Sequence, residues 1–125
     1  MVVDTSKIAS KQYVDDADAL KVALSSFTGT NQSLVGTGYQ KLPGGLIIQW
    51  GAIAPLIPGA GVSVTLPISF PSFCVFRDAQ FQITSNSATP LSFATDPGGT
   101  PLSSFIVRNT GGTTSGSSVW LAIGY

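Results

Sequence analysis

The sequence changes character near residue 41, and this division constrains the fold more than any other feature. Residues 1–41 contain four Lys and four Asp. The following region, residues 42–125, has only four charged residues: Arg77, Arg108, Asp78 and Asp96. All eight prolines lie in this second region. We therefore expect two structural regimes, one polar and helical and the other apolar and rich in turns.

The first segment, residues 1–30, contains one predicted helix, over Lys11–Phe27. Ser10 is a suitable N-cap, and Asp15 and Asp16 lie where carboxylates complement the positive end of the helix dipole. A heptad pattern relates its apolar residues, which are Tyr13, Ala17, Leu20, Leu24 and Phe27. Because so short a helix is marginal alone in water, this stripe must pack either on its own domain or against identical helices in a coiled coil.

The stretch 28–40 is rich in Gly, Thr, Ser and Asn and predicts a linker, placed at residues 31–41, and residues 42–125 predict a β-rich domain. Short apolar or alternating runs are typical of strands, which we expect at 46–50, 62–66, 73–83, 91–94, 105–107 and 119–123. Turn-forming clusters separate these runs at intervals that suit a compact β-sandwich-like domain. No Lys follows Lys41 to protect the sheet edges, so we expect neighbouring subunits to cover them.

The composition excludes several classes of function. Charged residues make up 10% of the chain and the net charge is zero, so the sequence has no electrostatic footprint for nucleic acid. With no His and a single Cys, we expect no metal, no cofactor and no imidazole-based catalytic pair. The most apolar stretch, 42–58, is interrupted by Pro and Gly, and the N-terminus lacks a signal-peptide core, so we expect neither membrane insertion nor export.

Three sequence blocks occur in a recognisable order: LPGGLIIQWG at Leu42–Gly51, LPISFP at Leu66–Pro71 and WLAIGY at Trp120–Tyr125. Together they resemble the C-terminal domain of bacteriophage tail fibre proteins, the gp53-like group. The upstream ASKQYVDD, Ala9–Asp16, is similar to the helical segment that precedes such tips. Related fibres occur on contractile bacteriocins and prophage-derived injection devices.

The resemblance implies a homotrimer, with the helix of residues 1–30 in a trimeric coiled coil and the β domain at the distal end of a longer fibre. Its partners would be the upstream part of the fibre and a lipopolysaccharide or another glycan on the bacterial host, to which it would mediate adsorption. The protein would be made in the host cytoplasm and become part of the virion. The expected trimer-interface residues are Tyr13, Ala17, Leu20, Leu24, Phe27, Trp50 and Trp120.

Receptor contacts are expected in two polar loops and their borders, because binding residues concentrate in loops on a rigid scaffold. The candidates are Asn86, Ser87, Thr89, Phe93, Asp96, Thr100, Arg108, Asn109, Thr110, Thr113 and Ser115. Arg108 suits a phosphate or carboxylate of lipopolysaccharide, with an ion pair to Asp78 or Asp96 as the alternative. Trp50 and Trp120 also have the aromatic faces that stack on sugar rings. Each lies in a strand-like run, which favours core or inter-subunit packing instead.

We expect no enzymatic activity. Glycoside hydrolysis usually requires two carboxylates at a defined separation, and the β region offers only Asp78 and Asp96. The predicted function is therefore a fibre tip that binds a receptor. A trimerisation cap that binds no ligand is the alternative, and a glycan-cleaving fibre is a more distant one.

Overall fold

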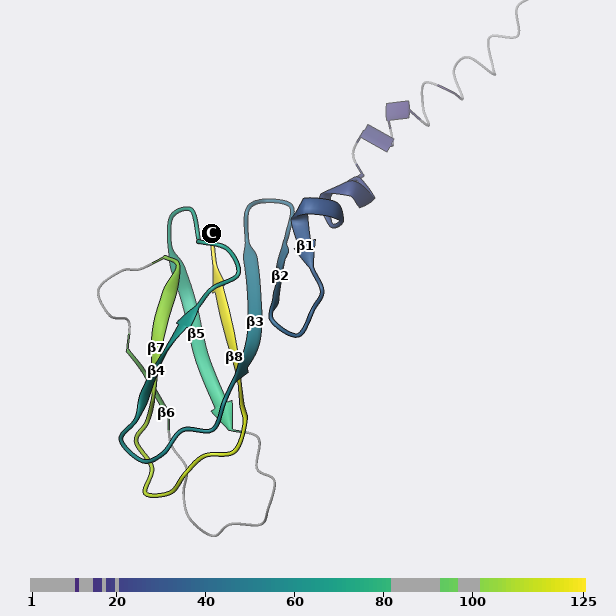
Figure 1. The fold of residues 1–125 in the computed structure, drawn as a ribbon. Helices are drawn as coiled ribbons and strands as arrows, with labels where there is room; N and C mark the ends of the chain where they lie inside the picture. Colours follow the sequence, from purple (N-terminus) through teal and green to yellow (C-terminus); the bar gives the residue numbers. More distant parts are fainter. Residues whose placement is uncertain (1–10, 12–14, 17, 20, 82–92, 97–101) are drawn as a thin grey trace, which may run out of the picture.

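A computed structural model describes residues 11, 15–16, 18–19, 21–81, 93–96 and 102–125. These residues form two antiparallel sheets, which confirms the prediction of a mainly β chain (Figure 1). The strands are β1 (Gln32–Ser33), β2 (Gly38–Lys41), β3 (Ile47–Ile53), β4 (Gly61–Thr65), β5 (Cys74–Phe81), β6 (Phe93–Asp96), β7 (Ser104–Asn109) and β8 (Ser118–Gly124). One sheet has the order β1-β2-β3-β8-β5 and the other β4-β7-β6.

The two central strands of the larger sheet, β3 and β8, show why this sequence forms a sandwich. Buried and more exposed residues alternate along both strands, as expected when one face of a strand meets a core. Their register pairs buried residues with buried residues, for example Gln49 with Ala122 and Gly51 with Trp120. The inner face of the larger sheet therefore packs on the smaller sheet.

The core lies between the two sheets and receives side chains from both. Trp120 of β8 is 4% exposed and Phe105 of β7 is 2% exposed. Their ring centroids lie 5.7 Å apart at an interplanar angle of 77°, the edge-to-face arrangement that aromatic pairs favour. The core of its own chain thus buries the Trp120 indole, which is the core packing expected as the alternative to inter-subunit packing. Its expected place at a trimer interface stays a prediction.

Close contact between β3 and β8 depends on a glycine. A Cβ atom on Gly51 would lie 2.6 Å from the indole of Trp120. We expect Gly51→Ala to lower the free energy of unfolding by about 1–3 kcal/mol, the usual cost of overpacking a core, as measured by urea denaturation. Gly112→Ala is the matched control because a Cβ there meets no atom within 4 Å, and equal losses for both variants would contradict this account.

The predicted helix over Lys11–Phe27 does not continue to Phe27. Ala23 is extended, with ψ 140°, and Leu24–Ser26 forms the 3₁₀ turn η1. A second 3₁₀ turn, η2, covers Gly29–Asn31. Thr and Asn side chains here bond to the backbone and so compete with helical hydrogen bonding. The Thr28 hydroxyl donates to the carbonyl of Leu24 at 3.4 Å, and the Asn31 side chain donates to the carbonyl of Ser25 at 3.1 Å.

Upstream of these turns, helical backbone is present at Lys11, Asp15, Asp16, Asp18 and Ala19. The remaining interface candidates of this stripe, Tyr13, Ala17 and Leu20, lie outside the described residues. Leu24 is 79% exposed in the single chain, and Phe27 is half-buried. No helix in the described ranges is long and apolar enough to cross a membrane.

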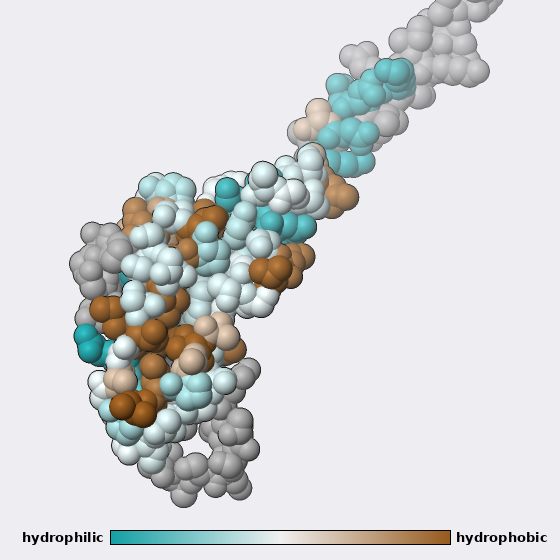
Figure 2. Space-filling view, viewed as in Figure 1, coloured by the Kyte–Doolittle hydropathy of each residue, from teal (hydrophilic) through white to brown (hydrophobic). Residues whose placement is uncertain are grey.

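The segment expected to be a linker forms the β1–β2 hairpin, so the larger sheet already begins at Gln32. The charge division seen in the sequence is also visible on the surface. Figure 2 shows hydrophilic residues gathered over the N-terminal segment and hydrophobic residues over the sandwich. This apolar surface is considerable for a chain with so few charges.

Candidate functional site

Two loops meet at the end of the sandwich that lies away from the N-terminal segment (Figure 1). Residues 54–60 connect β3 to β4, and residues 110–117 connect β7 to β8. We call this pair of loops the distal loops. Neither contains a charged residue. Ile57 is 63% exposed on the first loop, while Thr110 and Thr114 are exposed on the second.

Asn109, at the end of β7, holds the distal loops together. Its side-chain amide donates to the carbonyls of Leu56 and Thr113, both at 2.8 Å. Its side-chain oxygen accepts a hydrogen bond from the backbone N–H of Gly111 at 2.9 Å. Because Asn109 is 0% exposed, these bonds form away from water, where losing one is costly.

Ser115 makes a second connection between the same loops. The Leu56 N–H donates to the Ser115 hydroxyl at 2.8 Å, and the Ser115 N–H donates to the Leu56 carbonyl at 2.8 Å. Ser115 is 4% exposed. The distal loops therefore form one preorganised surface, in which buried side chains fix the backbone and other residues face solvent.

These placements correct part of the candidate receptor set. Asn109 and Ser115 were expected to contact a receptor, but their side chains are buried and satisfied within the chain, so they position the loops instead. Thr110 is exposed and Thr113 is half-buried in the second distal loop. Arg108 is exposed on β7 and forms no ion pair with any described side chain, Asp78 included.

The other candidates do not all belong to this end. In β6, Phe93 pairs with Asn109 beside the distal loops, whereas Asp96 pairs with Ile106, farther from them. Asn86, Ser87, Thr89 and Thr100 lie outside the described residues. Sequence reasoning missed the loop at 54–60 as a partner surface. The sequence of this loop shows an isoleucine, Ile57, among Pro and Gly residues. Such a pattern by itself predicts only a turn.

Trp50 lies on the outer face of the larger sheet and is half-buried. Its indole N–H donates to the carbonyl of Val35, in the β1–β2 turn, at 3.0 Å. Trp50 therefore anchors the hairpin turn to the sheet. Its expected place at a trimer interface stays a prediction.

Among solved structures, pyocin tail fibres share this fold. An N-truncated R2-type pyocin tail fibre is 25% identical over 82% of this chain, with a TM-score of 0.65. The chain spans only 40% of that structure, and 27% of an R2 pyocin fibre from P. aeruginosa, with the same identity and TM-score. An N-truncated R1-type pyocin tail fibre shares the fold, with 21% identity and a TM-score of 0.58. That match covers 91% of this chain and 95% of the R1 fibre chain.

These matches define the class of the protein, a β-rich domain of a tail fibre. The chain belongs to the family described as "Putative tail fiber protein gp53-like, C-terminal", which matches residues 41–125. The matched range begins at the last residue of β2 and includes strands β3 to β8 with both distal loops. The comparison with curated proteins found no match.

Proposed function

We propose that this domain is the tip of a homotrimeric tail fibre and that its distal loops bind a glycan on the bacterial host, lipopolysaccharide foremost. The observation that carries the proposal is the connection of the two loops through buried Asn109 and Ser115. A preorganised surface loses little conformational entropy when it binds. Such a surface at the end away from the upstream fibre suits adsorption by a phage or phage-like particle.

The chemistry of the distal loops matches a neutral glycan. Threonine hydroxyls and exposed backbone groups donate and accept hydrogen bonds as sugar hydroxyls do. Ile57 adds an apolar contact for the carbon face of a sugar ring. Arg108, one strand position before Asn109, supplies a cation for a phosphate or carboxylate on the same glycan.

We also propose that the domain binds without cleaving. A glycosidase needs two carboxyl groups facing one substrate, roughly 5–10 Å apart. Asp78 lies on the outer face of the larger sheet, whereas Asp96 ends a strand of the smaller sheet. Incubation with the bound polysaccharide is therefore expected to release no reducing ends.

An array of bacterial lipopolysaccharides and capsular polysaccharides, probed with the purified chain, tests the binding proposal. We expect binding to a subset of glycans. For uncharged glycans the binding should change by less than about threefold between 50 and 500 mM NaCl, because uncharged contacts are not screened by salt. Arg108→Ala should reduce binding only to phosphate-bearing glycans. Binding to no glycan while the chain remains folded would instead favour a structural cap.

A further inference from the structure

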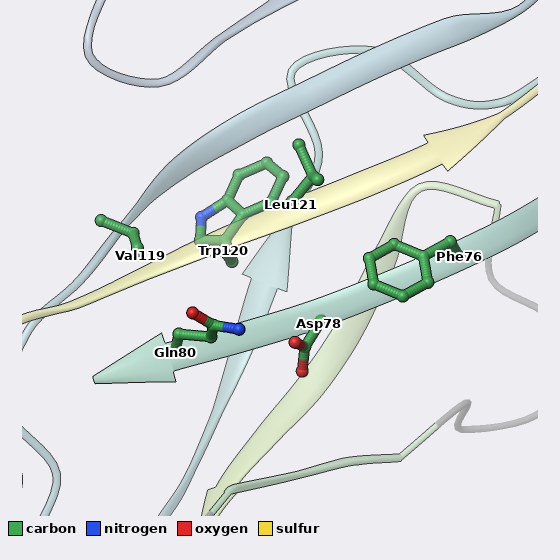
Figure 3. A pocket seen from close by; sticks show the side chains of 6 residues that line it. All are labelled: Phe76, Asp78, Gln80, Val119, Trp120 and Leu121. Carbon is green, nitrogen blue, oxygen red and sulfur yellow. The ribbon is translucent and has the colours of Figure 1, made fainter. Parts of the chain in front are cut away.

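The outer face of the larger sheet carries a mainly apolar groove. Phe76 of β5 is 46% exposed, and Val119 and Leu121 of β8 are 42% and 38% exposed. Figure 3 shows Phe76, Asp78 and Gln80 spaced along β5 beside these two β8 residues. Together with Trp120 they line a groove of about 240 Å³.

The opposite edge of the same sheet carries an apolar projection. The turn of the β1–β2 hairpin presents Leu34 and Val35, which are 68% and 62% exposed. The bond from the Trp50 indole to the Val35 carbonyl fixes this turn. We call Leu34 and Val35 the hairpin knob. These two adjacent aliphatic side chains add to the exposed apolar surface of the chain.

We propose that the hairpin knob of one chain inserts into the outer-face groove of a second copy. The proposal rests on the homotrimer of the proposed function and names the surfaces that would form it. Sheet order places the hairpin at one edge and the β5–β8 groove at the other. The two are about three strand spacings apart, roughly 14 Å, so the knob does not reach the groove of its own chain.

The chemistry and size of the two surfaces match. Both are formed mainly by aliphatic and aromatic side chains, and burying them together removes exposed apolar area from water. A cavity of about 150 Å³ lined by such residues accommodates a benzene molecule, so a groove of about 240 Å³ has room for the Leu34 and Val35 side chains. Asp78, half-buried at this groove, forms no ion pair with any described side chain.

The geometry also gives a head-to-tail contact rather than a face-to-face one. Each copy contributes its knob to one neighbour and its groove to the other. Such heterologous contacts form a closed ring when the rotation between copies returns to the start, and three copies do so with threefold symmetry. This arrangement leaves the distal loops free, because they lie at an end of the sandwich and not on its outer face.

Cysteine pairs test the contact directly. In a Cys74→Ala background, Leu34→Cys with Leu121→Cys is expected to form intermolecular disulfides that yield a covalent trimer on a non-reducing denaturing gel. Leu34→Cys with Ser63→Cys is the matched control, because Ser63 is exposed on the other sheet, and it should give none. A solution trimer with no Leu34–Leu121 crosslink, or with equal crosslinking in the control, would overturn the proposal.

A charge in the groove gives an independent measurement. Leu121→Asp is expected to raise the trimer dissociation constant of the full chain at least about 100-fold, because it removes an apolar contact with the knob and places a second carboxylate directly opposite Asp78. Ser63→Asp should change that constant little. A variant that remains trimeric but loses glycan binding would overturn the proposal and assign the groove to the glycan. A wild-type chain that is monomeric in solution would contradict the homotrimer itself. A trimer that forms through other surfaces would contradict only the contact proposed here.

Discussion

Replacing Asn109 by alanine is expected to lower the free energy of unfolding by about 3 kcal/mol or more. The substitution leaves the carbonyls of Leu56 and Thr113 and the N–H of Gly111 without their partner, and each buried unsatisfied group costs about 1–3 kcal/mol. Glycan binding should fall as well, since the distal loops lose their connection. Urea denaturation and the glycan array measure the two effects separately.

Thr114→Ala is the control for Asn109→Ala. Thr114 lies in the same loop but is exposed, so its stability should stay within about 0.5 kcal/mol of the wild type. If Asn109→Ala unfolds no more easily than this control, the loops are held by something other than Asn109. Unchanged glycan binding in a destabilised Asn109→Ala would show that loop order does not matter for recognition.

The second large effect is expected at Trp120. Truncation to alanine removes a side chain that is 4% exposed and its edge-to-face contact with Phe105. Buried Phe or Trp to Ala substitutions usually cost about 3–5 kcal/mol, a large part of the 5–15 kcal/mol typical of a native protein. We therefore expect Trp120→Ala to unfold at a much lower denaturant concentration than the wild type.

Trp50→Ala provides the comparison for Trp120→Ala. Its indole is half-buried on the outer face and makes one hydrogen bond, to Val35. Losing a single bond of this kind costs about 1 kcal/mol, in addition to a modest loss of apolar contact. A larger destabilisation at Trp50 than at Trp120 would contradict the assignment of the core to the space between the sheets.

Much of the fold could be predicted because half-buried strands have a simple period. The alternation at 62–66 and the apolar runs at 46–50 and 119–123 correspond closely to β4, β3 and β8. Those strands have one face in the core, so side-chain burial directly shapes their sequence. The helix boundary was harder to predict, since hydrogen bonds from Thr and Asn side chains to the backbone end it earlier than the apolar stripe suggests.

The candidate site was predicted only in part, for a chemical reason. Asn109 and Ser115 have the side chains that contact sugars, but the same side chains also satisfy buried backbone groups in turns. Only the fold shows which role each one has. The loop at 54–60 was missed because its contact with 110–117 joins segments more than 50 residues apart, as in the Asn109 bond to Leu56, and no local pattern records such a contact.

The central claim is that the distal loops contact the receptor. The most direct test is hydrogen–deuterium exchange of the fibre tip, free and bound to the glycan selected on the array. We expect slower exchange on binding at 54–60 and 110–117, with little change on the exposed strands of the smaller sheet. Protection confined to the outer face of β5 and β8, with unchanged exchange in both distal loops, would contradict the claim.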